Sequence, residues 1–295
     1  MEENNPIIRH VFTADPTVLE HRGIVYLYTG HDDPLPGSEQ YTMNDWLCFS
    51  SVNLVDWNTH PSPLAANDYS WASGDAFASK IICHNQKFYF FTAVSHKRIP
   101  GKAIGVATSE SPLGPFRDPR GEALVTGDML PVAADEKSNL DPSVIIDDDG
   151  SAYLFWGNGR CFYARLSANL LEIDSEISEL HLPHFNEGTH IYKRDGHYYL
   201  MYGYGAPERV AYAMSDNLHG AWKFVGIVNE LAGNCETNRP ATLDFKGKSY
   251  FFYHNGALPN GGSHRRSVCV DYMYYNGDGT IKKIVMSSEG ISPQK

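Results

Sequence analysis

The sequence lacks the features that would make nucleic acid or a membrane a partner. Its 24 Lys and Arg residues are outnumbered by 35 Asp and Glu residues, which gives a formal net charge of −11. It has no basic run and no apolar stretch of transmembrane length. Phosphate backbones and anionic lipids repel so acidic a chain. We therefore expect neither nucleic acid nor a membrane surface as a partner, and the sequence leaves the oligomeric state open.

Cysteine is scarce and unpatterned. There is no CxxC pair and no Cys/His cluster, and the five cysteines stand far apart: Cys48, Cys83, Cys161, Cys235 and Cys269. The odd count and wide spacing disfavour zinc and a disulfide framework, and they predict buried free thiols. The N-terminal run MEENNPIIRH also lacks the pattern of a signal peptide. That predicts a cytoplasmic protein, unless a signal has been removed, in which case it is periplasmic or secreted.

Aromatic residues, by contrast, are plentiful. They make up 13% of the chain, with 18 Tyr and 14 Phe. Aromatic side chains favour the half-buried surface of β-strands, so this enrichment indicates a β protein. Flat rings also suit sites that bind the faces of sugars.

A hairpin pattern repeats five times along the chain. Each copy has a polar residue, an apolar strand, a Gly or Asn turn and a Tyr/Phe-rich strand, at residues 15–30, 75–91, 141–157, 187–203 and 239–255. A second hairpin pattern follows each copy, at residues 47–64, 104–124, 161–180, 210–228 and 268–285. Two hairpins per repeat form a four-stranded antiparallel sheet. The sequence therefore predicts an all-β fold, a five-bladed β-propeller around a central channel, as one domain over residues 1–295. The alternative is a β-sandwich, which does not require five matched hairpin pairs.

Aligning the five first hairpins on their turns brings charged residues to equivalent places. Asp15, Asp141, Glu187 and Arg239 then precede four inner strands at one mouth of the channel, and blade two offers Phe77 or Ala78 instead. An Asp before Pro can simply start a turn, but a turn does not explain the whole set. Crowded carboxyl groups suit cleavage of a glycosidic bond, which needs one protonated and one ionised group. Their mutual repulsion separates the two pKa values.

The repeated segments resemble glycoside hydrolase family 43. The motifs that carry the resemblance are TADPTVLEHRGIVYLYTGHD, SWASGDAFASKIICHNQKFYFF, SNLDPSVIIDDDGSAYLFWGNG, FNEGTHIYKRDGHYYLMYG and GKSYFFYHNGALPNGGSHRRSVCVDYMYYNGDGTI. It spans about residues 5–281 and implies a five-bladed propeller that acts on arabinose- and xylose-containing polysaccharides with inversion. It further implies that Asp15 is the general base, Glu187 the general acid, and Asp141 the carboxylate that tunes and orients the acid.

Further site residues are implied on the same grounds. Arg266 resembles an arginine that contacts the sugar beside the scissile bond. The other candidates for substrate contact are Trp71, Asp75, Phe77, Asn158, Thr189 and Arg239, with His190 beside them. A core role for Trp71 or Phe77 is an open alternative. His31, His254 and His264 are expected to border the pocket, because they follow first-hairpin strands or neighbour Arg266.

One position departs from the family pattern. Relatives place a histidine, often linked to a channel metal, where the run CETNRPATLDF carries Arg239. A cation does not ligate a cation, so we expect no metal and no cofactor, although a calcium or sodium ion remains an alternative. Arg239 would then supply the positive charge itself.

The segment FYHNGAL…HRRSV looks most like the α-L-arabinofuranosidases of the family, so the resemblance implies an exo-acting enzyme of that kind that removes side chains from arabinan or arabinoxylan. A β-xylosidase or endo-xylanase is the alternative within the family. A carbohydrate-binding propeller with decayed catalysis and a scaffold for protein partners are alternatives from other classes. Three matched carboxylates argue against both.

Overall fold

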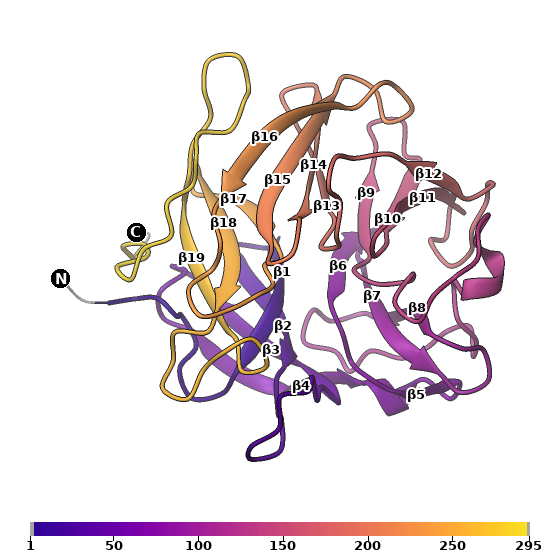
Figure 1. The fold of residues 1–295 in the computed structure, drawn as a ribbon, viewed down its shortest axis with the longest axis horizontal. Coiled ribbons are helices and arrows are strands. Elements are labelled where there is room, and N and C mark those ends of the chain that lie inside the picture. Colours follow the sequence, from indigo (N-terminus) through magenta and orange to yellow (C-terminus); the bar gives the residue numbers. More distant parts are fainter. Residues whose placement is uncertain (1–2, 294–295) are drawn as a thin grey trace.

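The computed structural model describes residues 3–293, which form five antiparallel sheets arranged in a ring (Figure 1). Blade one pairs β1 (Thr13–His21), β2 (Ile24–His31), β3 (Asp45–Ser51) and β4 (Asn58–Ala65) in that order. Blade two contains β5 (Ala72–Gly74), β6 (Ser79–His84), β7 (Lys87–His96) and β8 (Lys102–Ser109). There β7 pairs with both β6 and β8, and its far end pairs with β5.

The remaining three sheets follow in chain order. Blade three contains β9 (Ser143–Ile146), β10 (Ala152–Trp156), β11 (Cys161–Leu166) and β12 (Ser178–Leu180). Blade four contains β13 (His190–Arg194), β14 (His197–Tyr204), β15 (Arg209–Ser215) and β16 (Lys223–Asn229). Blade five contains β17 (Ala241–Phe245), β18 (Lys248–Asn255) and β19 (Ser267–Met273). Two short 3-10 helices, Ala66–Asp68 and Gly127–Met129, lie in connections.

The first strand of each repeated hairpin lies innermost. Contacts join β1 to β6 and β17, and join β9 to β6 and β13, so these strands surround the central axis. The prediction of an all-β, five-bladed propeller is confirmed. Because each inner strand begins at the same end of the ring, the residues that precede these strands meet at one mouth of the channel.

Two-residue turns close four of the five first hairpins. Across the first of them, His21 pairs with Ile24. Both turn residues have positive φ in each case: Arg22 and Gly23 (54° and 80°), Asn85 and Gln86 (50° and 61°), Asp195 and Gly196 (48° and 83°), and Lys246 and Gly247 (47° and 74°). A left-handed conformation at both positions matches the twist of antiparallel strands. The turn residues Gly and Asn in the sequence therefore fix the register of the inner hairpins.

The hydrophobic core is divided into five clusters, one for each contact between neighbouring blades. Alternate residues of one strand serve different clusters, because successive side chains of a strand point to opposite faces. On β7, Phe90 packs toward blade one, whereas Tyr89 and Phe91 pack toward blade three. Burial of each large apolar side chain contributes roughly 1.5–3 kcal/mol. This explains the many aromatic residues, since every blade presents two buried faces.

The outer edges of blades two and five differ from the predicted pattern. After β8, the expected partner strand is reduced to single bridges, such as the one between Thr108 and Arg117. That segment contains Pro112, Pro115 and Pro119, which have no N–H to donate to a strand partner. After β19, the chain crosses to blade four, where the N–H of Ile284 donates to the carbonyl of Val228 (2.7 Å). Blade five therefore has three strands within residues 3–293.

The cysteines are all free thiols, as predicted. Four are buried, and Cys83 on β6 is half-buried. Burial raises the pKa of the Cys48 thiol to about 12, which keeps it protonated and unreactive. In the described part of the chain, no helix is both long and apolar enough to cross a membrane.

The ring is closed where the N-terminal segment meets blade five. The N–H of Ile7 donates to the carbonyl of Val268 (2.9 Å), and that of Thr13 donates to the carbonyl of Arg266 (2.8 Å). The buried Asn5 side chain accepts from the N–H of Val270 (2.9 Å) and donates to the carbonyls of Val270 (3.1 Å) and Ser287 (2.9 Å). The side-chain amide of Asn5 therefore forms hydrogen bonds with backbone groups of both the last strand and the C-terminal segment.

Replacement of this amide should loosen the closure. We expect Asn5→Ala to lower the free energy of unfolding by about 2–4 kcal/mol, because buried backbone groups lose their partners. Urea unfolding measures the change. The matched control is Asn4→Ala, which removes a single half-buried hydrogen bond to Ile291 and should cost below about 1 kcal/mol. Equal losses in the two variants would contradict this account of the closure.

Candidate active site

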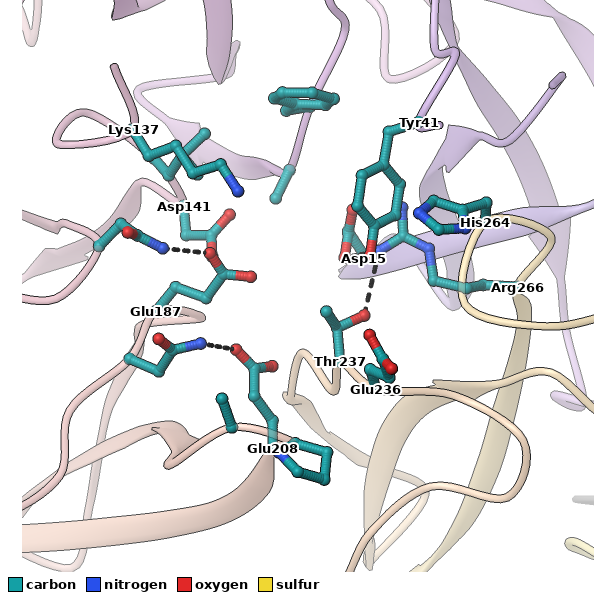
Figure 2. A pocket seen from close by; sticks show the side chains of 17 residues that line it. Asp15, Tyr41, Lys137, Asp141, Glu187, Glu208, Glu236, Thr237, His264 and Arg266 are labelled. Carbon is teal, nitrogen blue, oxygen red and sulfur yellow. Dashed lines mark hydrogen bonds and ion pairs between the residues drawn. The ribbon is translucent and has the colours of Figure 1, made fainter. Parts of the chain in front are cut away.

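A cavity of about 610 Å³ lies at the mouth of the channel where the inner strands begin. Asp15, Asp141 and Glu187 all line it, as do Phe77, Asn158 and Arg266. The other lining residues are Tyr41, Ala78, Lys137, Leu140, Asn186, Ala206, Pro207, Glu208, Glu236, Thr237 and His264. Figure 2 shows Asp15 beside Arg266 on one wall and Glu187 beside Asp141 on the facing wall. A volume of this size is typical of a pocket for a small molecule.

The backbone at the first two carboxylates is strained. Asp15 has a φ of 51° and Asp141 a φ of 55°, and each is followed by a proline. A non-glycine residue in this left-handed region costs roughly 1–3 kcal/mol and persists only where the surroundings impose it. Here the N–H of Asp15 donates to Nδ1 of His254 (3.1 Å), and the carbonyl of Asp141 accepts from the Thr189 hydroxyl (2.6 Å). In this backbone conformation the side chains of both residues line the cavity.

Asp15 is held by a buried network of charges. Its Oδ1 lies 3.2 Å from Nη1 of Arg266. The same guanidinium binds the buried Asp32 through Nε and Nη2, both at 2.9 Å. It also lies over the ring of Tyr41, with Cζ 4.9 Å from the ring centroid. The Arg266 guanidinium thus holds the Asp15 carboxylate in the cavity, and Asp32 fixes the orientation of the guanidinium.

His254 lies beneath Asp15 as a neutral ring. Burial, together with nearby Arg266, lowers the pKa of His254 well below its ordinary value. Because Nδ1 accepts from the N–H of Asp15, the proton is on Nε2, which donates to the carbonyl of Thr237 (3.0 Å). His254 therefore positions the backbone of Asp15 without adding charge. Of the other two predicted histidines, His264 lines the cavity, whereas His31 pairs with Asp45 (2.8 Å).

Arg239 crosses the channel beneath the cavity. From blade five it donates to the carbonyl of Pro142 in blade three (3.0 Å) and reaches the carbonyl of Ser79 in blade two (3.4 Å). Its Nη1 lies 3.0 Å from Oδ1 of Asp141, whose Oδ2 accepts from the N–H of Gly188 (2.6 Å). Burial raises the pKa of Asp141, and the Arg239 charge opposes that rise. Arg239 is therefore a buried partner of Asp141 and does not itself line the cavity.

Glu187 has a different environment. Its Oε2 accepts from the side-chain amide of Asn158 (2.6 Å). Burial raises the pKa of Glu187 well above its ordinary value, and the charges of Asp141 and Glu208 raise it further. Within residues 3–293, no Lys, Arg or His side chain forms an ion pair with it. These surroundings favour the protonated form of Glu187, while Asp15 on the facing wall is paired with a cation.

Four predicted substrate contacts do not line the cavity: Arg239, described above, and Trp71, Asp75 and Thr189. Trp71 is buried in blade two, where its ring stacks on His96 (5.4 Å between centroids) and its Nε1 donates to Asp118 (3.0 Å). Asp75 pairs with Lys102 (2.6 Å), and Lys102 in turn lies over the ring of Phe77. Thr189 donates its hydroxyl to the carbonyl of Asp141, as described above. Of the blade-two candidates, only Phe77 lines the cavity, because the chain turns between these positions.

The sequence interpretation overlooked several residues of the site. Tyr41 and Lys137 come from long connections, and Glu208 and Glu236 precede or follow strands outside the five aligned inner hairpins. No repeat alignment brings them to an equivalent position. Their only sequence signal is a charged or aromatic residue in a loop at the same end of the ring as Asp15.

The centre of the channel does not fit a metal ion. The family resemblance implies a cation there, but the charges of Arg239 and Lys80 act on each other and on His190 in this part of the channel. Burial, together with the Arg239 charge, lowers the pKa of Lys80 to about 8. Burial and these two cations lower the pKa of His190 well below its ordinary value. In the described part of the chain, no group of three or more His, Cys, Asp or Glu side chains is arranged to hold a metal.

Comparison with known proteins places this site in a family. The family model "Glycosyl hydrolases family 43" matches residues 3–281. The chain therefore belongs to glycoside hydrolase family 43, as its motifs suggested.

Two solved structures and one curated protein of the family are similar to this chain over nearly its whole length. A solved α-L-arabinofuranosidase from Clostridium thermocellum ATCC 27405 is 31% identical, with a TM-score of 0.81 and 96% of each chain covered. A β-xylosidase/α-arabinofuranosidase from a compost metagenome, solved with xylotriose, is 25% identical, with a TM-score of 0.86 over 96% of this chain and 97% of that one. The arabinoxylan arabinofuranohydrolase of Bacillus subtilis (strain 168) is 28% identical over 98% of this chain. The chain spans 65% of the length of that curated relative.

The cationic channel gives a prediction that does not depend on activity. We expect neither EDTA nor millimolar calcium to change Tm, because Arg239 and Lys80 repel a divalent ion. A site with a micromolar Kd would instead add about 4 kcal/mol at millimolar calcium. Differential scanning calorimetry measures Tm under the three conditions. A rise of several degrees with calcium, reversed by EDTA, would show that the channel has been misread.

Proposed function

We propose that this chain hydrolyses terminal α-L-arabinofuranosyl groups from arabinan or arabinoxylan with inversion of the anomeric centre. One observation carries the proposal. A cation-paired carboxylate, Asp15, and a carboxyl group whose surroundings raise its pKa, Glu187, face each other across one cavity (Figure 2). Inverting hydrolysis requires such a pair, separated by enough space for a water molecule and the sugar.

The proton movements follow from the two environments. Asp15 takes a proton from a water molecule as the oxygen of that water molecule attacks the anomeric carbon. Glu187 gives its proton to the departing glycosidic oxygen as that bond breaks. Asp141 does not exchange a proton in this scheme. Its charge, together with burial, favours the protonated form of Glu187, and Arg239 fixes its orientation.

The shape of the site supports action on chain ends. The cavity lies at the channel mouth, and the inner strands and Arg239 lie beneath it. Such a pocket suits a terminal sugar better than the middle of a chain. The arabinofuranosidase relatives support arabinose as that sugar. A β-xylosidase is the second candidate, since the relative solved with xylotriose has the same fold. A decayed carbohydrate-binding propeller would not need to keep Asp15 and Glu187 in contrasting environments.

Replacement of the two acting carboxyl groups should abolish most of the turnover. We expect Asp15→Asn and Glu187→Gln each to lower kcat by about 10²–10⁴-fold, the usual contribution of a general base or acid. Asp141→Asn should also lower kcat, because Glu187 then loses its proton more readily. Circular dichroism checks that each variant keeps the fold. Turnover like that of the wild type in any variant removes that residue from its role.

Paired substrates test the reaction itself. We expect 4-nitrophenyl α-L-arabinofuranoside to be cleaved faster than 4-nitrophenyl β-D-xyloside, with no effect of EDTA on the rate. Proton NMR of the first-formed sugar should show the anomer opposite to that of the substrate, because water attacks the face away from the leaving group. Retention of configuration contradicts the mechanism, and a preference for the xyloside contradicts the arabinose assignment.

A further inference from the structure

A fourth carboxyl group, that of Glu208, lines the cavity close to Glu187. It lies on the loop between β14 and β15 and is 2% exposed. Figure 2 shows its side chain on the same wall as Glu187 and Asp141. The mechanism described above uses Asp15, Asp141 and Glu187 and leaves Glu208 without a role.

The surroundings of Glu208 bind both oxygens of its carboxylate. Its Oε1 accepts from the Asn186 side-chain amide (2.5 Å), and its Oε2 accepts from the N–H of Asn238 (2.8 Å). A Cβ on Gly203 would lie 2.8 Å from the carboxyl carbon of Glu208, so a side chain there would displace the carboxyl group from this place. Three separate segments of the chain thus accommodate one carboxyl group.

This arrangement is costly for stability. Burial of an ionised carboxylate is unfavourable unless a cation compensates it. Among residues 3–293, Glu208 forms no ion pair. Burial raises the pKa of Glu208 to about 7, while the donors Asn238 and Asn186 oppose the rise. Packing alone would be served as well by an uncharged side chain.

Glu208 is linked to Glu187 through shared backbone. Asn186, which binds the Glu208 carboxylate, directly precedes Glu187 in the chain. Gly203, which makes room for that carboxylate, donates its N–H to the carbonyl of Glu187 (2.7 Å) and accepts from the N–H of Asn186 (2.9 Å). Any charge on Glu208 is therefore held at a fixed place relative to Glu187.

The other charges around Glu208 are mainly negative. Asp141 on the same wall and Asp15 on the facing wall both repel it. Glu236 lies near it, since the carbonyl of Glu236 accepts the N–H of Glu208 (2.8 Å), but the Glu236 side chain is exposed. Arg239 and Arg266 are bound to Asp141 and Asp15. Lys137 also lines the cavity, but its side chain is exposed, and among residues 3–293 neither Glu208 nor Glu187 forms an ion pair.

We propose that Glu208 is a positioning residue whose negative charge keeps the proton on Glu187 between turnovers. This inference rests on the proposed hydrolytic function. When Glu187 has given its proton to the departing oxygen, it is left ionised beside Glu208. Their repulsion favours the return of a proton from solvent to Glu187, which restores the acid for the next cycle.

The pH profile of Glu208→Gln tests the proposal. The wild type must first hydrolyse 4-nitrophenyl α-L-arabinofuranoside or the β-D-xyloside, and failure there counts against the proposed function. In the variant, loss of a negative charge lets Glu187 ionise at lower pH. The alkaline limb of kcat/KM should therefore move to lower pH by about one unit, a loss of about tenfold on that limb.

The leaving group gives a second readout. Phenol departs less readily than 4-nitrophenol and depends more on protonation by Glu187. On the alkaline limb, Glu208→Gln should therefore lose more activity on the phenyl glycoside than on the 4-nitrophenyl glycoside. A merely structural role would lower both rates equally at every pH. An unmoved limb with only a raised KM would also overturn the proposal, since it would make Glu208 a sugar-binding group.

Two further variants complete the experiment. Asn186→Ala removes a donor that favours the ionised form of Glu208, so the limb should move in the same direction by a smaller amount. It replaces Glu208→Gln if that variant does not fold. Glu236→Gln is the matched control, because solvent screens its exposed charge and the limb should stay in place. A limb that stays in place in Asn186→Ala, or an equal shift in Glu236→Gln, contradicts the proposal.

Discussion

The contact between Asp15 and Arg266 joins the two ends of the chain. Asp15 belongs to the first blade, yet Arg266 and His254, which hold it, belong to the last blade. Asp15, the proposed base, is therefore in place only when the ring is closed. The hydrogen bonds of Asn5 to the last strand serve the same closure. Stability and activity depend in this way on one seam between blades.

The carboxyl groups of the site differ in the charged groups that surround each one. Asp15 shares a guanidinium with the buried Asp32, and Asp141 faces Arg239. Among residues 3–293, Glu187 accepts from the Asn158 amide and forms no ion pair, and the charges that raise its pKa are those of carboxyl groups. Carboxyl groups that share one cavity can therefore have different protonation states at the same pH.

The inner hairpins could be predicted from the sequence because their information is local. A turn such as Arg22-Gly23 and an aromatic partner strand lie within a few residues of each other, and their repetition aligned Asp15, Asp141 and Glu187. The outer edges could not be predicted in this way. Whether the segment after β19 pairs with its own blade or with Val228 depends on the neighbouring blade.

The same limit applies to the rest of the site. Trp71 and Phe77 are close in sequence, but only the turn between them decides which ring meets the cavity. Glu208 belongs to no repeat. Its place depends on the missing side chain of Gly203 and the amide of Asn186, which are distant from it along the chain or on another strand.

Arg239 has a consequence for the passage of products. Its guanidinium bridges blades two, three and five across the axis, directly below Asp141. Under the proposed action on chain ends, the cleaved sugar would lie deeper in the cavity than the remainder of the chain, above the guanidinium of Arg239. The remainder would then depart first, and the sugar would leave last by the same opening, where it would compete with incoming substrate.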